Sequence, residues 1–175
     1  MPREVNSDKA IDVIAELREA IKVQMEKNNP LVKHRIVLVG DSLIRGYACS
    51  LRPLLGNSFD VYGVVKPGSD TNELLNSAKD SIELLNHDDM LVFCYGSNDL
   101  DQEMNYSCTF QNIKKFMMEN NHTNILVINL PARYELTNSD YANRNLLRLN
   151  RKLQKLFKIN PHSKFLVTSK EKNYL

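Results

Sequence analysis

The stretch "IVLVGDSLIRGY", residues 36–47, decides how this chain folds, because an apolar run passes directly into a polar turn. Ile36 to Val39 are all apolar, which is typical of a strand that is buried on both faces. The polar turn Gly40-Asp41-Ser42 follows, and a helical pattern runs from Leu43 to Leu55. The sequence therefore predicts a strand, a tight turn and a helix, with Ser42 exposed at the turn, where it is either a helix cap or a nucleophile.

Four more short apolar runs predict four more strands, and most of the runs are apolar throughout, as in strands buried on both faces. They are "FDVYGVV" (59–65), "MLVFCYG" (90–96), "NILVINL" (124–130) and "KFLVTS" (164–169). Helical patterns separate the runs, over 43–55, 71–85, 110–118 and 143–157. Alternation of strands and helices is typical of a parallel sheet with helices on both faces. We expect "KFLVTS" to lie at the edge of that sheet.

An amphipathic helix is predicted within residues 1–30, ahead of a domain that we place at 31–175. Its apolar residues recur at spacings of three and four, at Ile11, Ile14, Leu17, Ile21 and Met25. We interpret it as a helix that packs on the domain and partly covers the sheet. A coiled coil is the alternative, but the pattern covers too few heptads to establish one.

Composition is that of an ordinary globular domain, with 42% hydrophobic residues and a net charge of +2 over 175 residues. The sequence contains neither an apolar run of about 18 residues nor a secretory signal. Three cysteines lack the spacing of a disulfide framework, so we expect reduced thiols, with Cys94 in the core. These features favour a cytoplasmic protein, with the nucleus as an alternative. No metal or cofactor motif is present.

Basic residues mark one side of the helix predicted over 143–157. They are Arg144, Arg148, Arg151, Lys152, Lys155 and Lys158. We interpret them as a solvated helix face, because the total charge of the chain is nearly balanced. Contact with phosphate is the alternative. Neither reading gives a clear nucleic-acid or membrane signal.

Ligands of open parallel sheets bind beyond the carboxyl ends of the strands, so the loops there carry the candidate site. They are "GDS" (40–42), "KPGSDTNE" (66–73), "GSND" (96–99) and "PARYELTNSDY" (131–141). Ser42 offers a hydroxyl and an N–H, Gly68 a backbone N–H, and Asn98 a side-chain amide. Taken singly, these residues are also ordinary caps and turn residues. Three donors at the ends of three strands suit an oxyanion hole, which stabilises a tetrahedral intermediate.

The same blocks resemble the SGNH (GDSL) hydrolase superfamily. The likeness rests on Gly40-Asp41-Ser42, on Gly68 and on Gly96-Ser97-Asn98-Asp99, and it spans residues 35 to about 169. The stretches "GDSLIRGYACSLRPLL" and "VVKPGS" also resemble SGNH-type modules of arthropod genomes that accompany mobile elements.

This resemblance implies a flavodoxin-like α/β/α sandwich with strand order 2-1-3-4-5 and an ester hydrolase activity without a cofactor. It implies that Ser42 is the nucleophile, supported by Asp41. It also implies that the Ser42 N–H, the Gly68 N–H and the Asn98 side chain hold the oxyanion. The substrate would be a small-molecule ester or acyl group.

The family's general base is a histidine, with an aspartate three residues before it, in a loop after the fifth strand. No histidine follows residue 169 in this sequence. The four histidines present, His34, His87, His122 and His162, each come just before a strand, so we expect them at the opposite edge of the sheet. Asp70, Asp99 and Asp101 are only weak substitutes.

We therefore expect a C-terminally truncated SGNH domain with little activity. A non-catalytic SGNH-like binding or assembly module is the alternative. A flavodoxin-like nucleotide binder is disfavoured, because "GDSLIRG" is not a glycine-rich phosphate loop. Self-association through the first helix or the sheet edge is also expected, since an uncovered strand edge favours pairing.

Overall fold

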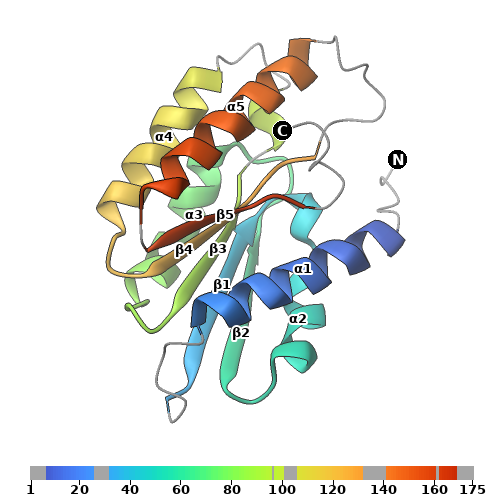
Figure 1. The fold of residues 1–175 in the computed structure, drawn as a ribbon, viewed down its shortest axis with the longest axis vertical. Coiled ribbons are helices and arrows are strands. Elements are labelled where there is room, and N and C mark those ends of the chain that lie inside the picture. Colours follow the sequence, from blue (N-terminus) through green and yellow to red (C-terminus); the bar gives the residue numbers. More distant parts are fainter. Residues whose placement is uncertain are drawn as a thin grey trace.

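The structure is a computed structural model that describes residues 7–25, 32–95, 97–100, 106–131, 141–160 and 162–168. It contains one parallel sheet with strand order β2-β1-β3-β4-β5, which confirms the predicted flavodoxin-like α/β fold (Figure 1). The strands are β1 (His34–Gly40), β2 (Phe59–Val65), β3 (Met90–Cys94), β4 (Asn124–Ile128) and β5 (Ser163–Leu166). The helices are α1 (Ser7–Met25), α2 (Tyr47–Leu55), α3 (Thr71–Glu83), α4 (Tyr106–Glu119) and α5 (Tyr141–Lys158). Two short 3-10 turns are η1 (Ser42–Ile44) and η2 (Ser97–Leu100).

The three central strands are almost wholly buried, as their continuous apolar sequences predict. Every residue of β3 is buried, and so are all but one in β1 and in β4. The outer strands β2 and β5 are mostly half-buried or exposed, and Tyr62 of β2 is 52% exposed. A central strand is covered on both faces whereas an edge strand is not, so burial follows strand order.

Helices cover both faces of the sheet (Figure 1). α3, α4 and α5 lie side by side on one face, because the connections from β2 to β3, β4 and β5 all move in one direction across the sheet. α2 follows the only connection that moves the other way, so it lies on the opposite face, beside α1. No helix in the described part of the chain is long and apolar enough to cross a membrane.

The predicted packing of α1 is confirmed. Leu17 and Ile21 have no exposed surface and belong to the same hydrophobic core as the sheet. Arg18 ties α1 to α2, since its Nε donates to the carbonyl oxygen of Leu54 at 3.1 Å. Burial of one such apolar side chain is worth about 1.5–3 kcal/mol, so α1 contributes strongly to the stability of the fold.

The helix predicted from Leu43 is wrong at its start. The chain forms the 3-10 turn η1 first, and α2 begins only at Tyr47. Gly46 separates the two with φ of 83°, a left-handed conformation that glycine adopts without steric cost. Ser42 therefore stands on a single tight turn, and no long helix places a positive end beside it.

Candidate active site

The turn after β1 presents Ser42 to solvent and buries the residue before it. Ser42 is exposed, whereas Asp41 has no exposed surface. Oδ1 of Asp41 accepts a hydrogen bond of 2.9 Å from the Leu43 N–H, which caps η1. Asp41 thus fixes the turn that carries Ser42. No described residue accepts a hydrogen bond from the Ser42 N–H or hydroxyl.

Gly40 lets the ends of β1 and β3 approach closely. A Cβ atom at this position would lie 3.0 Å from the carbonyl oxygen of Cys94 and 3.0 Å from the side chain of Ile44. Such contacts are shorter than side chains tolerate without displacing a neighbour. Any larger residue would therefore force a neighbour to move where the strand turns towards Ser42.

The loop after β2 is joined to the end of β1. The Lys66 N–H donates to the carbonyl oxygen of Gly40 at 3.0 Å, and the Ser69 N–H donates back to the Lys66 carbonyl at 3.4 Å. Gly68 has φ of 77°, which fits the third position of a type II turn with Pro67 before it. Gly68 is exposed, and its N–H donates to no described residue.

Asn98 joins the loop after β3 to the loop after β2. Its Nδ2 donates to the carbonyl oxygen of Ser69 at 3.0 Å, which fixes the plane of the amide. A side-chain amide has two N–H groups, and no described residue accepts from the second one. The structure therefore brings the loops of Ser42, Gly68 and Asn98 together at one edge of the sheet. Gly96 of the same predicted block lies outside the described residues.

A second link between these loops was not predicted from the sequence. Asp99 is 3% exposed, and its Oδ1 accepts a hydrogen bond of 3.0 Å from the Thr71 N–H at the start of α3. The Thr71 hydroxyl donates to Oδ2 of the same carboxylate. Burial raises the pKa of Asp99, and the hydrogen bonds from Thr71 oppose that rise.

The carboxylates considered as substitute bases have structural roles. Asp70 caps α3 in a capping box, where Oδ1 accepts from the Glu73 N–H at 2.8 Å and the Glu73 side chain accepts from the Asp70 N–H. Asp99 is held by Thr71. Asp101 lies outside the described residues. The spacing "DTNE" at 70–73 is the sequence signal of this capping box.

Two buried groups, the Cys94 thiol at the end of β3 and the Tyr47 hydroxyl at the start of α2, have raised pKa values. Burial, followed by the charge of Asp41, raises the pKa of the Cys94 thiol well above its ordinary value. Burial also raises the pKa of Tyr47 to about 12. Both groups stay protonated at neutral pH, so neither is an activated nucleophile. The prediction that Cys94 is a core residue is confirmed, since it is 4% exposed.

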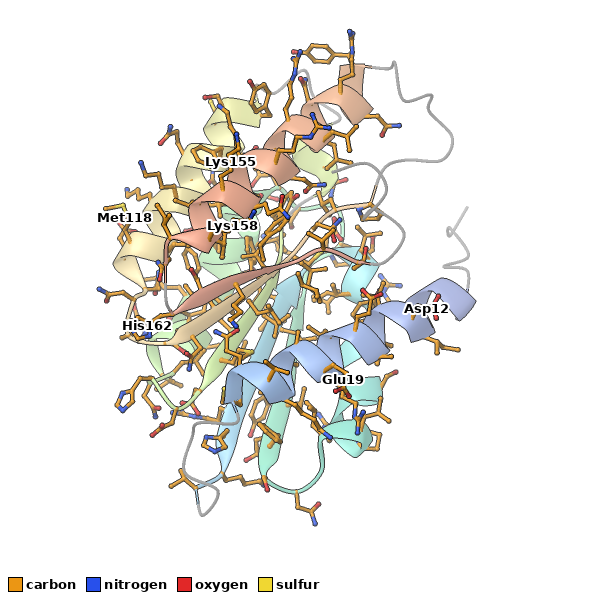
Figure 2. The ribbon with its side chains drawn as sticks, in the orientation of Figure 1. Asp12, Glu19, Met118, Lys155, Lys158 and His162 are labelled. Carbon is orange, nitrogen blue, oxygen red and sulfur yellow. The ribbon has the colours of Figure 1, made fainter. Side chains whose placement is uncertain are left out.

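All four histidines lie at the opposite edge of the sheet from Ser42. His34 is the first residue of β1, and its Nδ1 lies 2.7 Å from the carbonyl oxygen of Asp88. His87, His122 and His162 precede β3, β4 and β5, and Figure 2 shows His162 at the start of β5. A seven-residue strand spans about 20 Å, whereas a base must lie within about 3 Å of the hydroxyl.

A buried polar network holds the chain where it leaves β4 and β5, beside the same edge. Tyr95 donates its hydroxyl proton to Oδ1 of Asn150, whose Nδ2 donates to the carbonyl oxygen of Leu130 at 3.0 Å. Oδ1 of Asn129 accepts from the Thr168 N–H at 2.9 Å. The candidate loop 131–141 lies outside the described residues except at its two ends. Among the described residues, no group of His, Cys, Asp and Glu is arranged to hold a metal ion.

Comparison with known proteins supports the fold. Neither a protein-family model nor a curated protein matches the chain. A member of the lipolytic protein G-D-S-L family from Veillonella parvula DSM 2008 superimposes with a TM-score of 0.65, at 12% identity over 77% of each chain. AlinE4, an SGNH-hydrolase family esterase, does so with a TM-score of 0.60, at 18% identity over 77% of this chain and 75% of its own. With this similarity and its 2-1-3-4-5 sheet, the chain has the fold of the SGNH (GDSL) hydrolases.

Proposed function

We propose that the edge of the sheet at Ser42 is an acyl-ester hydrolase site. The observation that supports this most directly is the convergence of three loops there. Hydrogen bonds from Lys66 to Gly40 and from Asn98 to Ser69 tie them together. The Ser42 N–H, the Gly68 N–H and one N–H of Asn98 have no partner among the described residues.

In the proposed reaction the Ser42 hydroxyl oxygen attacks the ester carbonyl carbon and loses its proton to a base. The carbonyl oxygen becomes an oxyanion, and the three N–H donors stabilise it. The C–O bond to the alcohol then breaks, the alcohol leaves with a proton, and water releases the acyl group from Ser42 in a second step. The G-D-S-L family protein and the SGNH esterase named above suggest this class of substrate.

The described part of the chain places no histidine at this edge of the sheet to accept that proton. Every histidine of the sequence lies at the far edge of the sheet, and the carboxylates of Asp70 and Asp99 are engaged in capping. An alcohol without a base is a poor nucleophile. We therefore expect slow turnover by this chain alone. A non-catalytic module that binds an acyl group at the same edge of the sheet is the second candidate.

Chemical rescue separates these candidates. Hydrolysis of p-nitrophenyl acetate is measured with and without imidazole, which replaces the missing base in solution. The rate that imidazole adds to the wild type should exceed the rate that it adds to Ser42→Ala. Asn98→Ala should lower the Ser42-dependent part by about 10²–10³, the usual cost of one oxyanion donor. Ser50→Ala, at an exposed serine of α2, is the matched control and should leave the rate unchanged.

Equal imidazole-dependent rates in the wild type and in Ser42→Ala would contradict the nucleophile assignment and favour the binding module. Alanine substitutions of the four histidines should change nothing. Loss of a Ser42-dependent rate in any of them would show that a histidine reaches the site, contrary to the sheet geometry.

A further inference from the structure

The outer side of α5 carries a concentrated positive charge. Six basic residues of this helix are exposed, and the sequence from 141 to 158 contains no acidic residue. They are Arg144, Arg148, Arg151, Lys152, Lys155 and Lys158, and we call them the α5 basic row. Six positive charges exceed the net charge of +2, so the remainder of the chain is net negative. The near-balance of the whole sequence therefore conceals a strongly polarised surface.

The row is straight and narrow. At 100° per residue the six positions fall within about 120° of the helix circumference, and from Arg144 to Lys158 they extend about 21 Å. The opposite side of α5 is fixed in the core by Leu146, Leu149 and Leu153, each at most 2% exposed. Figure 2 shows Lys155 and Lys158 on α5. A helix held in this way presents its charges in a fixed register.

Four members of the row have no acidic partner among the described residues. No described acidic residue lies within ion-pairing distance of Arg144, Arg148, Lys155 or Lys158. Lys152 leans towards α4, where its Nζ lies 4.9 Å from the ring centre of Tyr106 and 5.4 Å from that of Phe110. Lys114 follows these two aromatic residues at helical spacing, so it extends the positive surface onto α4.

We propose that the α5 basic row binds the phosphate backbone of a nucleic acid. A rod-shaped polyanion matches a straight row, since duplex DNA presents about one phosphate per 1.7 Å, or about twelve along the 21 Å of the row. Half of the row is arginine, whose guanidinium forms paired hydrogen bonds with phosphate oxygens. This binding is independent of the ester hydrolase proposal, because it uses no residue of the Ser42 edge.

A phospholipid bilayer is the competing polyanion, and the surface fits it less well. Helices that lie on membranes insert an apolar face beside their basic residues. The apolar face of α5 is buried against the sheet, and the large exposed apolar residues of this helix and its flanks, Tyr141 at 59% and Ile159 at 81%, stand at its two ends. The α5 basic row itself has only charged side chains to offer a ligand, which suits the evenly spaced phosphates of a nucleic acid backbone.

The test uses a fluorescein-labelled 20-base-pair DNA duplex and the whole 175-residue protein, with binding followed by anisotropy between 50 and 200 mM NaCl. The logarithm of the association constant should fall with the logarithm of salt concentration with a slope of about −4 to −5, as expected for four to six phosphate contacts. Arg148→Glu/Lys155→Glu should weaken binding at least about 100-fold at 50 mM NaCl and make the slope shallower. Arg148→Gln/Lys155→Gln removes the two positive charges without adding negative ones, so it should reduce the magnitude of the slope by about two.

The matched control is Lys33→Glu/Lys79→Glu, which changes the net charge by the same amount at two exposed lysines outside the row. It should leave the affinity within about threefold, while circular dichroism verifies that every variant is folded. Equal weakening by the control would show attraction by net charge alone and would overturn the proposal. So would absence of binding at 50 mM NaCl, or row-dependent binding to phosphatidylserine vesicles in preference to the duplex.

Discussion

The buried pair of Asp99 and Thr71 makes a prediction about stability that depends on pH. Asp99→Ala removes the acceptor of buried donors that include the Thr71 N–H, the Thr71 hydroxyl and the Thr109 side chain. Each buried donor left without a partner costs about 1–3 kcal/mol. Removal of a buried carboxylate offsets part of this cost, so we expect the free energy of unfolding at pH 7 to fall by about 2–4 kcal/mol. Asp99→Asn keeps one acceptor for the Thr71 N–H and should cost less.

The pH dependence follows from the direction of the pKa shift. Burial raises the pKa of Asp99 in the folded state above its unfolded value of about 3.9. Between these two values the folded state retains a proton that the unfolded state has lost, so the stability contributed by Asp99 falls as pH rises. The wild type should therefore be most stable relative to Asp99→Asn below about pH 4, and the difference should decline towards neutral pH.

Urea denaturation followed by circular dichroism, repeated at several pH values, measures both effects. Asp80→Ala on the exposed side of α3 is the matched control and should change stability by less than about 0.5 kcal/mol. A wild type that gains stability over Asp99→Asn as pH rises would show a lowered pKa and refute the reasoning. Equal stability of Asp99→Ala and Asp99→Asn would show that the bonds to Thr71 contribute nothing.

Two further predictions concern the core. Leu17→Ala on α1 should lower the free energy of unfolding, measured in urea, by about 2–5 kcal/mol, because Leu17 is fully buried. The control Ile11→Ala, at a position that is 63% exposed, should lower it by less than about 0.5 kcal/mol. Similar values for both variants would mean that α1 does not cover the sheet. Ellman's reagent should react with the exposed Cys49 and Cys108 in the native protein and with the buried Cys94 only after unfolding, because burial keeps that thiol protonated. Rapid labelling of all three native cysteines would contradict the described packing around Cys94.

Sequence reasoning was most successful where one physical signal dominates. Continuous apolar runs predicted the central strands, because a strand covered on both faces excludes polar side chains. The run at 59–65 also matches the bounds of β2, but β2 is an edge strand and most of its residues are half-buried or exposed, so the expectation of full burial is wrong there. The strand order came from the family resemblance, because the apolar pattern does not determine which strands are neighbours.

Two features of the site were not predicted because they depend on contacts between segments distant in the sequence. The Asp99–Thr71 link spans 28 residues, and Asn98 reaches Ser69 across 29. Periodicity contains no information about such pairs. The start of α2 was missed for a local reason, since Gly46 adopts a left-handed conformation that a single glycine in a helical pattern does not reveal.

These links have a consequence for the proposed site, because they couple its geometry to the stability of the fold. Asn98 and Asp99 are consecutive, so the bond from Asn98 to Ser69 and the bond from Thr71 to Asp99 hold the same two loops. Loss of the Thr71 bonds in Asp99→Ala should loosen both loops and lower the imidazole-rescued, Ser42-dependent rate together with stability. Ser42→Ala should abolish that rate and leave stability unchanged, since Ser42 is exposed and its side chain bonds to no described residue. If Asp99 and Thr71 position the donors of the site, Asp99→Ala must lower both the rate and the stability, and Ser42→Ala must lower the rate alone.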